Sequence, residues 1–258
     1  MLAHRHPRRA CCARRLTSTL ALAVALGIAS HLAAPPRALA GTITGSKHDM
    51  TSALAKGGGL MGLVMNNYGE ICVYCHTPHN ANSELAGAPL WNRQAPTGPY
   101  TMYASDTVDT ELPGRPSAYS LICLSCHDGT IAVDAIINQP GEGAPWHGNT
   151  ETPLHFKMKM EVNACGECHN GGAVHDQSFA YIGTDLRATH PISMVYPTAA
   201  QDPKFNAPPD LGSGWGDIKL FNGKVECPSC HNPHDPDNRP FLRKSNANSA
   251  LCKTCHVK

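Results

Sequence analysis

The chain has 258 residues, of which 21 are Lys or Arg and 20 are Asp or Glu. Aromatic residues make up only 6% of it, against 23 Gly and 21 Pro, so few bulky side chains are available to fill a large protein core. This composition argues against a basic nucleic-acid-binding protein and predicts that something other than side chains fills the interior.

Residues 1–40 have the pattern of a secretory signal peptide. A basic stretch without acidic residues precedes the apolar run LTSTLALAVALGIASHLAA, and Ala38 and Ala40 supply the small residues of a cleavage site. An uncleaved membrane anchor is the alternative, but the run is short for a span and His31 interrupts it. We therefore expect an exported protein that resides in the periplasm, at the cell surface or outside the cell. Loss of the six leader arginines leaves 15 Lys and Arg against 20 Asp and Glu, a formal charge of −5.

C-x-x-C-H sequences divide the remaining chain into three segments. Residues 41–140 hold two of them, residues 141–185 hold one and are rich in Gly, and residues 186–258 hold two. We expect a short helix at each of them and further helices over Ser117–Ser125 and Ile131–Ile137. The Pro- and Gly-rich stretches Gly87–Tyr100 and Gln201–Gly216 predict loops, and little β-sheet is expected.

Ten of the twelve cysteines lie in the five C-x-x-C-H sequences, which is the attachment pattern of c-type haem. Two cysteines three residues apart lie on one side of a helical turn, where they can form thioethers with the two vinyl groups of one porphyrin. The His that follows can then ligate the iron. We therefore expect five covalently attached haem c groups. The expected thioether residues are Cys72, Cys75, Cys123, Cys126, Cys165, Cys168, Cys227, Cys230, Cys252 and Cys255, and the expected proximal iron ligands are His76, His127, His169, His231 and His256.

Two other readings of the cysteines are five disulfides in an exported chain and zinc binding by the C-x-x-C pairs. Neither requires a His directly after each pair. With 15 His among 258 residues, five such positions would arise by chance about once in a million sequences, which favours haem.

Seven histidines outside the leader and the motifs are candidate distal ligands: His48, His79, His147, His155, His175, His190 and His234. His79 and His234 each lie three residues after a proximal His with a Pro between, which is too little chain to reach both faces of one porphyrin. Each should therefore face another haem. We expect His79 to cap the haem at Cys123–His127 and His234 to cap the haem at Cys252–His256.

A weak internal repeat suggests the other distal ligands. SKHD with His48 precedes the first pair of motifs, and ATHPIS with His190 precedes the last pair. This predicts that His48 caps the haem at Cys72–His76 and that His190 caps the haem at Cys227–His231. The middle haem at Cys165–His169 needs His147, His155 or His175, and His155 is favoured. Met158 and Met160 also lie nearby, and a Met ligand would raise the potential of that haem.

These sequences resemble the multihaem c-type cytochromes with a doubled C-x-x-C-H motif. The resemblance rests on SKHDM…CVYCHTPHN…CLSCHDGT and on HPIS…CPSCHNPH…LCKTCH, and the middle site departs from it. It implies a fold of irregular loops and short helices packed around covalently bound haems. It also implies electron transport outside the cytoplasm, and some members of this group polymerise into extracellular haem filaments. Because the haems would supply the core, we expect no stable fold without them.

The sequence therefore predicts an electron carrier rather than an enzyme. Two axial imidazoles on each iron leave no position for a substrate. The alternative is a reductase of a small oxyanion with one open haem, for which the middle site, with Lys157, Lys159 and His175 nearby, is the candidate. Expected partners are redox proteins with basic docking patches, such as other cytochromes or a quinol-oxidising membrane complex. A spare His could instead ligate a haem in the next subunit of a filament.

Overall fold

A computed structural model describes residues 42–52, 68–85, 87, 89–140 and 180–257, all of which belong to one unit, Gly41–Lys258. The predicted site at Cys165–His169 lies outside the described residues. So do the leader and the histidines His147, His155 and His175.

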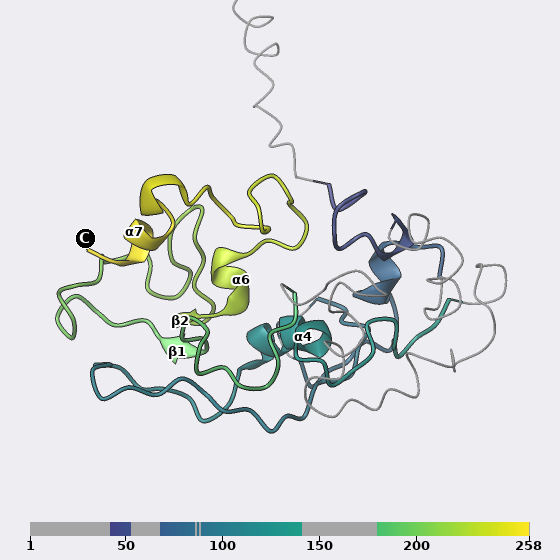
Figure 1. The fold of residues 1–258 in the computed structure, drawn as a ribbon, viewed down its shortest axis with the longest axis horizontal. Coiled ribbons are helices and arrows are strands. Elements are labelled where there is room, and N and C mark those ends of the chain that lie inside the picture. Colours follow the sequence, from purple (N-terminus) through teal and green to yellow (C-terminus); the bar gives the residue numbers. More distant parts are fainter. Residues whose placement is uncertain (1–41, 53–67, 86, 88, 141–179, 258) are drawn as a thin grey trace, which may run out of the picture. The chain divides into compact units, whose positions relative to one another are not determined.

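Loops make up most of the described chain, with a few short helices and two short strands (Figure 1). This agrees with the expected fold of irregular loops and short helices with little sheet. The elements in chain order are the 3-10 helix η1 (Cys72–Tyr74), α4 (Ala118–His127), β1 (Met194–Val195), β2 (Lys224–Val225), α6 (Cys227–Cys230), the 3-10 helix η2 (Ala247–Ser249) and α7 (Cys252–Cys255).

Short helices lie at all four described C-x-x-C-H sequences, as predicted. Helix α4 is the longest of the named helices. It confirms the helix predicted at Ser117–Ser125 and extends it to His127. Leu121 and Leu124 lie on its buried face, three residues apart. Asp128 is the C-cap of this helix, and its Oδ1 accepts a hydrogen bond from the backbone N–H of Thr130. Gly129 follows with a φ of 75°.

The prediction of a helix at Ile131–Ile137 is wrong, because Arg93 and Asn92 form hydrogen bonds with the backbone of this segment. The guanidinium of Arg93 donates hydrogen bonds to the carbonyls of Ala132 and Val133 at 2.7 Å each. The backbone N–H of Ile137 donates to the carbonyl of Asn92 at 2.8 Å. The segment forms turns instead, since its carbonyls already have partners outside it.

Two small hydrophobic clusters form the described protein core. One contains Leu85, Trp91, Leu121, Leu124 and Leu186, with Cys75 packed against it. The other contains Met194, Tyr196, Leu220 and Val225, with Cys255 packed against it. Each cluster therefore adjoins an attachment site.

The only named strands of the described chain, β1 and β2, pair antiparallel, with Met194 opposite Val225 and Val195 opposite Lys224. In the loops Gly87–Tyr100 and Gln201–Gly216 the described residues form neither helix nor strand, as expected. None of the helices in the described ranges is long and apolar enough to cross a membrane.

Candidate functional site

At α6 and α7 the helical turn ends so that the motif His leaves the helix, whereas His127 is the last residue of α4. At α6 and α7 the two cysteines occupy the first and last helical positions, and the following His231 and His256 are extended, with ψ of 142° and 132°. Their backbone N–H groups still bond to the carbonyls of Cys227 and Cys252. The imidazole is thus turned away from the helix while both cysteines stay on one turn. All eight cysteines of the four described sites are free.

Three of the C-x-x-C-H histidines have the ring oriented by a backbone carbonyl. Nδ1 of His76 lies 2.8 Å from the carbonyl oxygen of Pro89, that of His127 lies 2.6 Å from Ala180, and that of His231 lies 2.9 Å from Pro240. Because a carbonyl only accepts, Nδ1 carries the proton and donates it, which leaves Nε2 as the metal-binding nitrogen. Metal-bound histidines in proteins are oriented in this way.

The first and fourth sites share a local structure that sequence reasoning missed. After Pro89, Leu90 adopts a φ of 54° and Trp91 forms an isolated β-bridge with His76. After Pro240, Phe241 adopts a φ of 60° and Leu242 forms the same bridge with His231. The signal in the sequence is Pro followed by two large apolar residues, PLW and PFL, downstream of C-H-x-P-H.

Three pairs of imidazole rings approach each other, and each pair joins a C-x-x-C-H histidine to one outside the motifs. The ring centroids are 6.1 Å apart for His48 and His127, 6.1 Å for His76 and His234, and 6.4 Å for His190 and His256. A bond from a metal to an imidazole nitrogen is about 2.0 Å long and the ring centre lies roughly 1 Å further, so two imidazoles on opposite sides of one metal ion have centroids roughly 6 Å apart. The three pairs therefore fit one haem iron each.

The pair that contains His234 differs from the predicted one. His234 does approach another site than its own, as the short spacing requires, but its neighbour is His76 and not His256. The last segment of the chain therefore reaches the first attachment site.

The predicted neighbours of His48 and His79 are also corrected. His48 lies next to His127 rather than His76, so the position opposite His127 is not taken by His79. Residues distant in sequence place His48: its Nδ1 is 3.3 Å from the carbonyl oxygen of Pro233, and its ring stacks on Phe241 with centroids 4.2 Å apart. The sequence around His48 could not reveal these contacts, because Pro233 and Phe241 lie far from it in the chain.

His190 lies next to His256 rather than His231. The reason is the packing of α7 against the residues that follow β1. The hydroxyl of Tyr196 donates hydrogen bonds to the carbonyls of Asn206 and Cys255 at 2.7 and 3.1 Å. This brings the end of α7 to the segment that carries His190.

Burial lowers the pKa of His48 and of His234 below the usual value. Neighbouring histidines lower the pKa of both further, and for His48 the hydrogen bond with Pro233 opposes the effect. A lowered pKa keeps the imidazole neutral near pH 7, which is the form that binds a metal.

The attachment sites on α4 and α6 meet at their cysteines. The thiols of Cys123 and Cys227 form a hydrogen bond, which together with burial raises the pKa of Cys123. The two helices also pack directly against each other. Burial likewise raises the pKa of Cys75 to about 12, and Cys126 is the next contributor. Cysteines of different sites are therefore neighbours.

Residues 220–258 match the protein family described as "Doubled CXXCH motif". The match supports a multihaem c-type cytochrome. It covers the sites at Cys227–His231 and Cys252–His256, and these motifs indicate covalently bound haem c and a role in electron transfer. No curated protein matches the chain. Within the described ranges, no group of three or more His, Cys, Asp or Glu side chains is arranged to hold a metal ion by itself.

Two of the described histidines belong to none of the three imidazole pairs. They are His231, whose ring is held by Pro240, and His79. His79 is exposed and lines a cavity of about 370 Å³ together with Glu70, Thr77 and Asn138. His79 thus faces open space next to the first attachment site.

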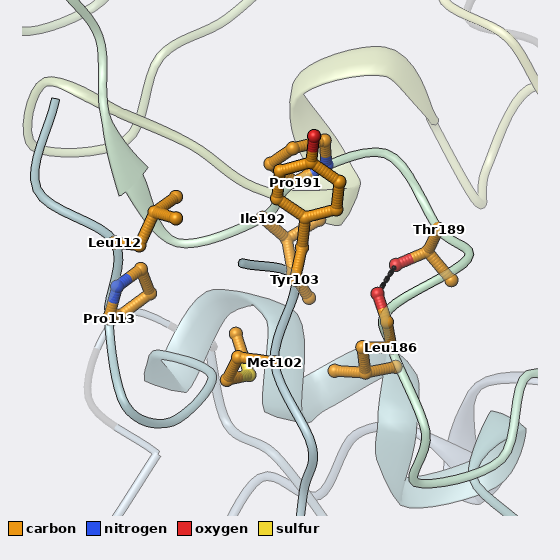
Figure 2. A pocket seen from close by; sticks show the side chains of 8 residues that line it. All are labelled: Met102, Tyr103, Leu112, Pro113, Leu186, Thr189, Pro191 and Ile192. Carbon is orange, nitrogen blue, oxygen red and sulfur yellow. Dashed lines mark hydrogen bonds between the residues drawn. The ribbon is translucent and has the colours of Figure 1, made fainter. Parts of the chain in front are cut away.

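A small apolar pocket adjoins the segment that carries His190 (Figure 2). Thr189 and Pro191, which flank His190 in the chain, line it together with Tyr103 and Leu112. The hydroxyl of Thr189 donates a 2.8 Å hydrogen bond to the carbonyl of Leu186. The pocket leaves no room for a water molecule, so its lining side chains pack closely together.

Proposed function

We propose that the chain is an exported five-haem c-type cytochrome that transfers electrons through closely spaced haems, each held by two histidines. The observation that carries the proposal is the three imidazole pairs with centroids 6.1–6.4 Å apart. A protein that used its C-x-x-C pairs for disulfides or zinc would have no reason to bring a distant His to each motif His at that separation.

The ligands that follow from the pairs are His76 with His234, His127 with His48, and His256 with His190. The sequence adds the sites of His169 and His231, which gives five haems. His155 remains the expected distal ligand at His169, with His147 and His175 as the alternatives. We propose His79 or one of these two for the haem at His231.

Bound haem supplies one-electron redox chemistry. The cysteines would hold the porphyrin. Backbone carbonyls contact Nδ1 and so leave Nε2 for the iron in His48, His76, His127, His190 and His231. With two protein ligands per iron, no position is left for a substrate, so the proposed role is a carrier and not an enzyme. The contact of Cys123 with Cys227 brings two attachment sites together, which favours transfer between them.

The test is a haem count on the exported, purified protein together with electron paramagnetic resonance (EPR) spectra with and without cyanide. Five haems per chain, all low-spin with two imidazoles and inert to cyanide, are expected. A high-spin fraction near one in five that binds cyanide would instead favour the oxyanion reductase with one open haem. Protein exported without haem would contradict the proposal.

Partners and location are further parts of the proposal. The acidic mature chain should dock basic patches on redox partners such as other cytochromes or a quinol-oxidising membrane complex, with association that slows as salt rises. Sedimentation of the native protein distinguishes a monomeric periplasmic carrier from a subunit that assembles into a filament outside the cell.

A further inference from the structure

Glu226 is a buried carboxylate next to an attachment site. It caps the N-terminus of α6, directly before Cys227, and only 2% of it is exposed. Its carboxylate accepts hydrogen bonds from three serine hydroxyls: Ser117 at 2.6 Å, Ser193 at 2.8 Å, and Ser120. Its backbone N–H donates to the hydroxyl of Ser229 at 2.8 Å, which completes a capping box.

The described residues provide no cation for this carboxylate. Among the described residues, no Lys or Arg forms an ion pair with Glu226, and the recorded pairs are Arg187 with Asp185 and Lys244 with Asp217. A buried carboxylate without a cation is unfavourable unless hydrogen bonds replace its water. The serines do so, and Ser193 is held in the left-handed region at a φ of 60° to take part.

The serines tie Glu226 to the helix of another site. Ser117 is the N-cap of α4 and Ser120 lies in its first turn, one turn before Cys123. The hydroxyl of Ser120 also accepts a hydrogen bond from the backbone N–H of Cys227 at 3.1 Å. Glu226 thus lies between α4 and α6, beside the place where Cys123 and Cys227 meet.

We propose that Glu226 sets the reduction potentials of two haems, those at Cys123–His127 and Cys227–His231, by holding a negative charge between them. The inference rests on the proposed function. Reduction adds an electron to the haem, and a nearby fixed negative charge opposes this, so the oxidised form is favoured. The effect is strong here because the carboxylate is shielded from water and salt. Glu226 acts through space and is a potential-setting residue, not an iron ligand.

The experiment compares Glu226→Gln with the wild type by potentiometric titration of the haem-loaded full chain, followed by the EPR signals of individual haems. Gln keeps the shape and removes the charge. Two haems should become easier to reduce, with the reduced-to-oxidised ratio at a fixed potential rising about tenfold, which is ~59 mV for one electron. The signal that changes in His48→Met identifies the haem at Cys123–His127.

Two matched variants separate charge from structure. Glu226→Asp keeps the charge and should leave both potentials near those of the wild type, whereas a purely structural role would make Asp and Gln behave alike. Glu111→Gln removes the charge of an exposed carboxylate and should move neither potential. Unchanged potentials in Glu226→Gln, with all haems bound, would overturn the inference and leave the proposed function intact.

A measurement on the wild type covers the case in which Glu226→Gln fails to load its haems. The haem identified by His48→Met should then titrate at a lower potential than the haem identified by His234→Met, which lies at the first site. The reverse order would overturn the inference. Absence of haem from the wild type itself would instead refute the proposed function.

Discussion

Backbone carbonyls orient five histidines of the described chain through Nδ1, and four of these carbonyls belong to Pro. The pairs are His48 with Pro233, His76 with Pro89, His190 with Pro191, His231 with Pro240, and His127 with Ala180. Because the Pro ring fixes φ, one of the two torsions that set the direction of its carbonyl is constrained before any metal binds. The chain thus prepares the rings for ligation at the level of single residues, which lowers the entropy lost on binding.

His234→Met should change one haem, the one at Cys72–His76. Replacing an imidazole by a thioether raises the reduction potential of that haem and alters its EPR signal. The assignment is checked in a second background, Cys72→Ser with Cys75→Ser, in which that haem is not attached. There, His234→Met should have no spectral effect, because the two changes act on the same site. An effect that persists in this background and disappears when the site at Cys252–Cys255 is removed would restore the pairing that the sequence alone suggests.

Phe241→Ala should loosen His48 and so open the haem at Cys123–His127. The Phe241 ring stacks on His48 with centroids 4.2 Å apart, and its loss removes one of the two contacts from the last segment that position this imidazole. We expect one haem of the reduced protein to bind carbon monoxide, measured by visible spectroscopy. Leu90→Ala is the matched control, since Leu90 has the equivalent position and a similar φ but is 53% exposed. Equal binding in both variants would mean that the backbone, not the ring contact, positions His48.

At the scale of elements, Arg93 organises the loops around the first two sites. It is fully buried, and its guanidinium donates to the carbonyls of Ser125, Ala132 and Val133. These bonds connect the loop after the first motif to α4 and to the segment that follows α4. Arg93 therefore holds the segment Ile131–Ile137 in turns and joins it to α4 and to the loop after the first motif.

Arg93→Gln should destabilise the haem-loaded protein. Hydrogen bonds from a charged donor contribute about 1.5–3 kcal/mol each, and their loss leaves buried carbonyls without a partner, so a fall of about 3 kcal/mol or more in the free energy of unfolding is expected. Denaturant titration of the haem-loaded protein measures it. Arg187→Gln removes an exposed guanidinium and should leave the midpoint unchanged. A small effect of Arg93→Gln would show that water replaces the guanidinium.

Features that depend on residues close together in the chain could be predicted from the sequence, and features that depend on distant residues could not. The helix at Cys123–His127 was predictable, because two cysteines and a His on one turn are a local requirement of the chemistry. The turns at Ile131–Ile137 were not, since Arg93 lies about forty positions earlier in the chain. The neighbour of His48 was not predictable either, because Pro233 and Phe241 lie in the last segment. Repeats in the sequence identify the candidate ligands, and long-range packing selects the pairs.

At the scale of the whole molecule, residues of the last segment lie at both described C-x-x-C-H sites of the first segment. His234 of the last segment approaches His76 of the first, while His48 of the first is held by Pro233 and Phe241 of the last. Neither segment alone contains the ring pair at His76 or the contacts that place His48. The two segments therefore form one interdependent arrangement rather than two independent modules, even though each carries its own pair of motifs.

The chain without haem should show no cooperative unfolding transition. Its described hydrophobic clusters contain only five and four buried residues, which is too little apolar burial to offset the conformational entropy of so many loops. The measurement is thermal unfolding of residues 41–258 produced where haem is not attached, followed by circular dichroism and Trp fluorescence, beside the haem-loaded protein. Haem-loaded protein should unfold in one sharp transition, because each paired His site then connects distant segments through a metal. A sharp transition in the haem-free chain would mean that buried groups such as Arg93 and Glu226 hold the fold by themselves. The imidazole pairs would then be a preformed site rather than a product of haem binding.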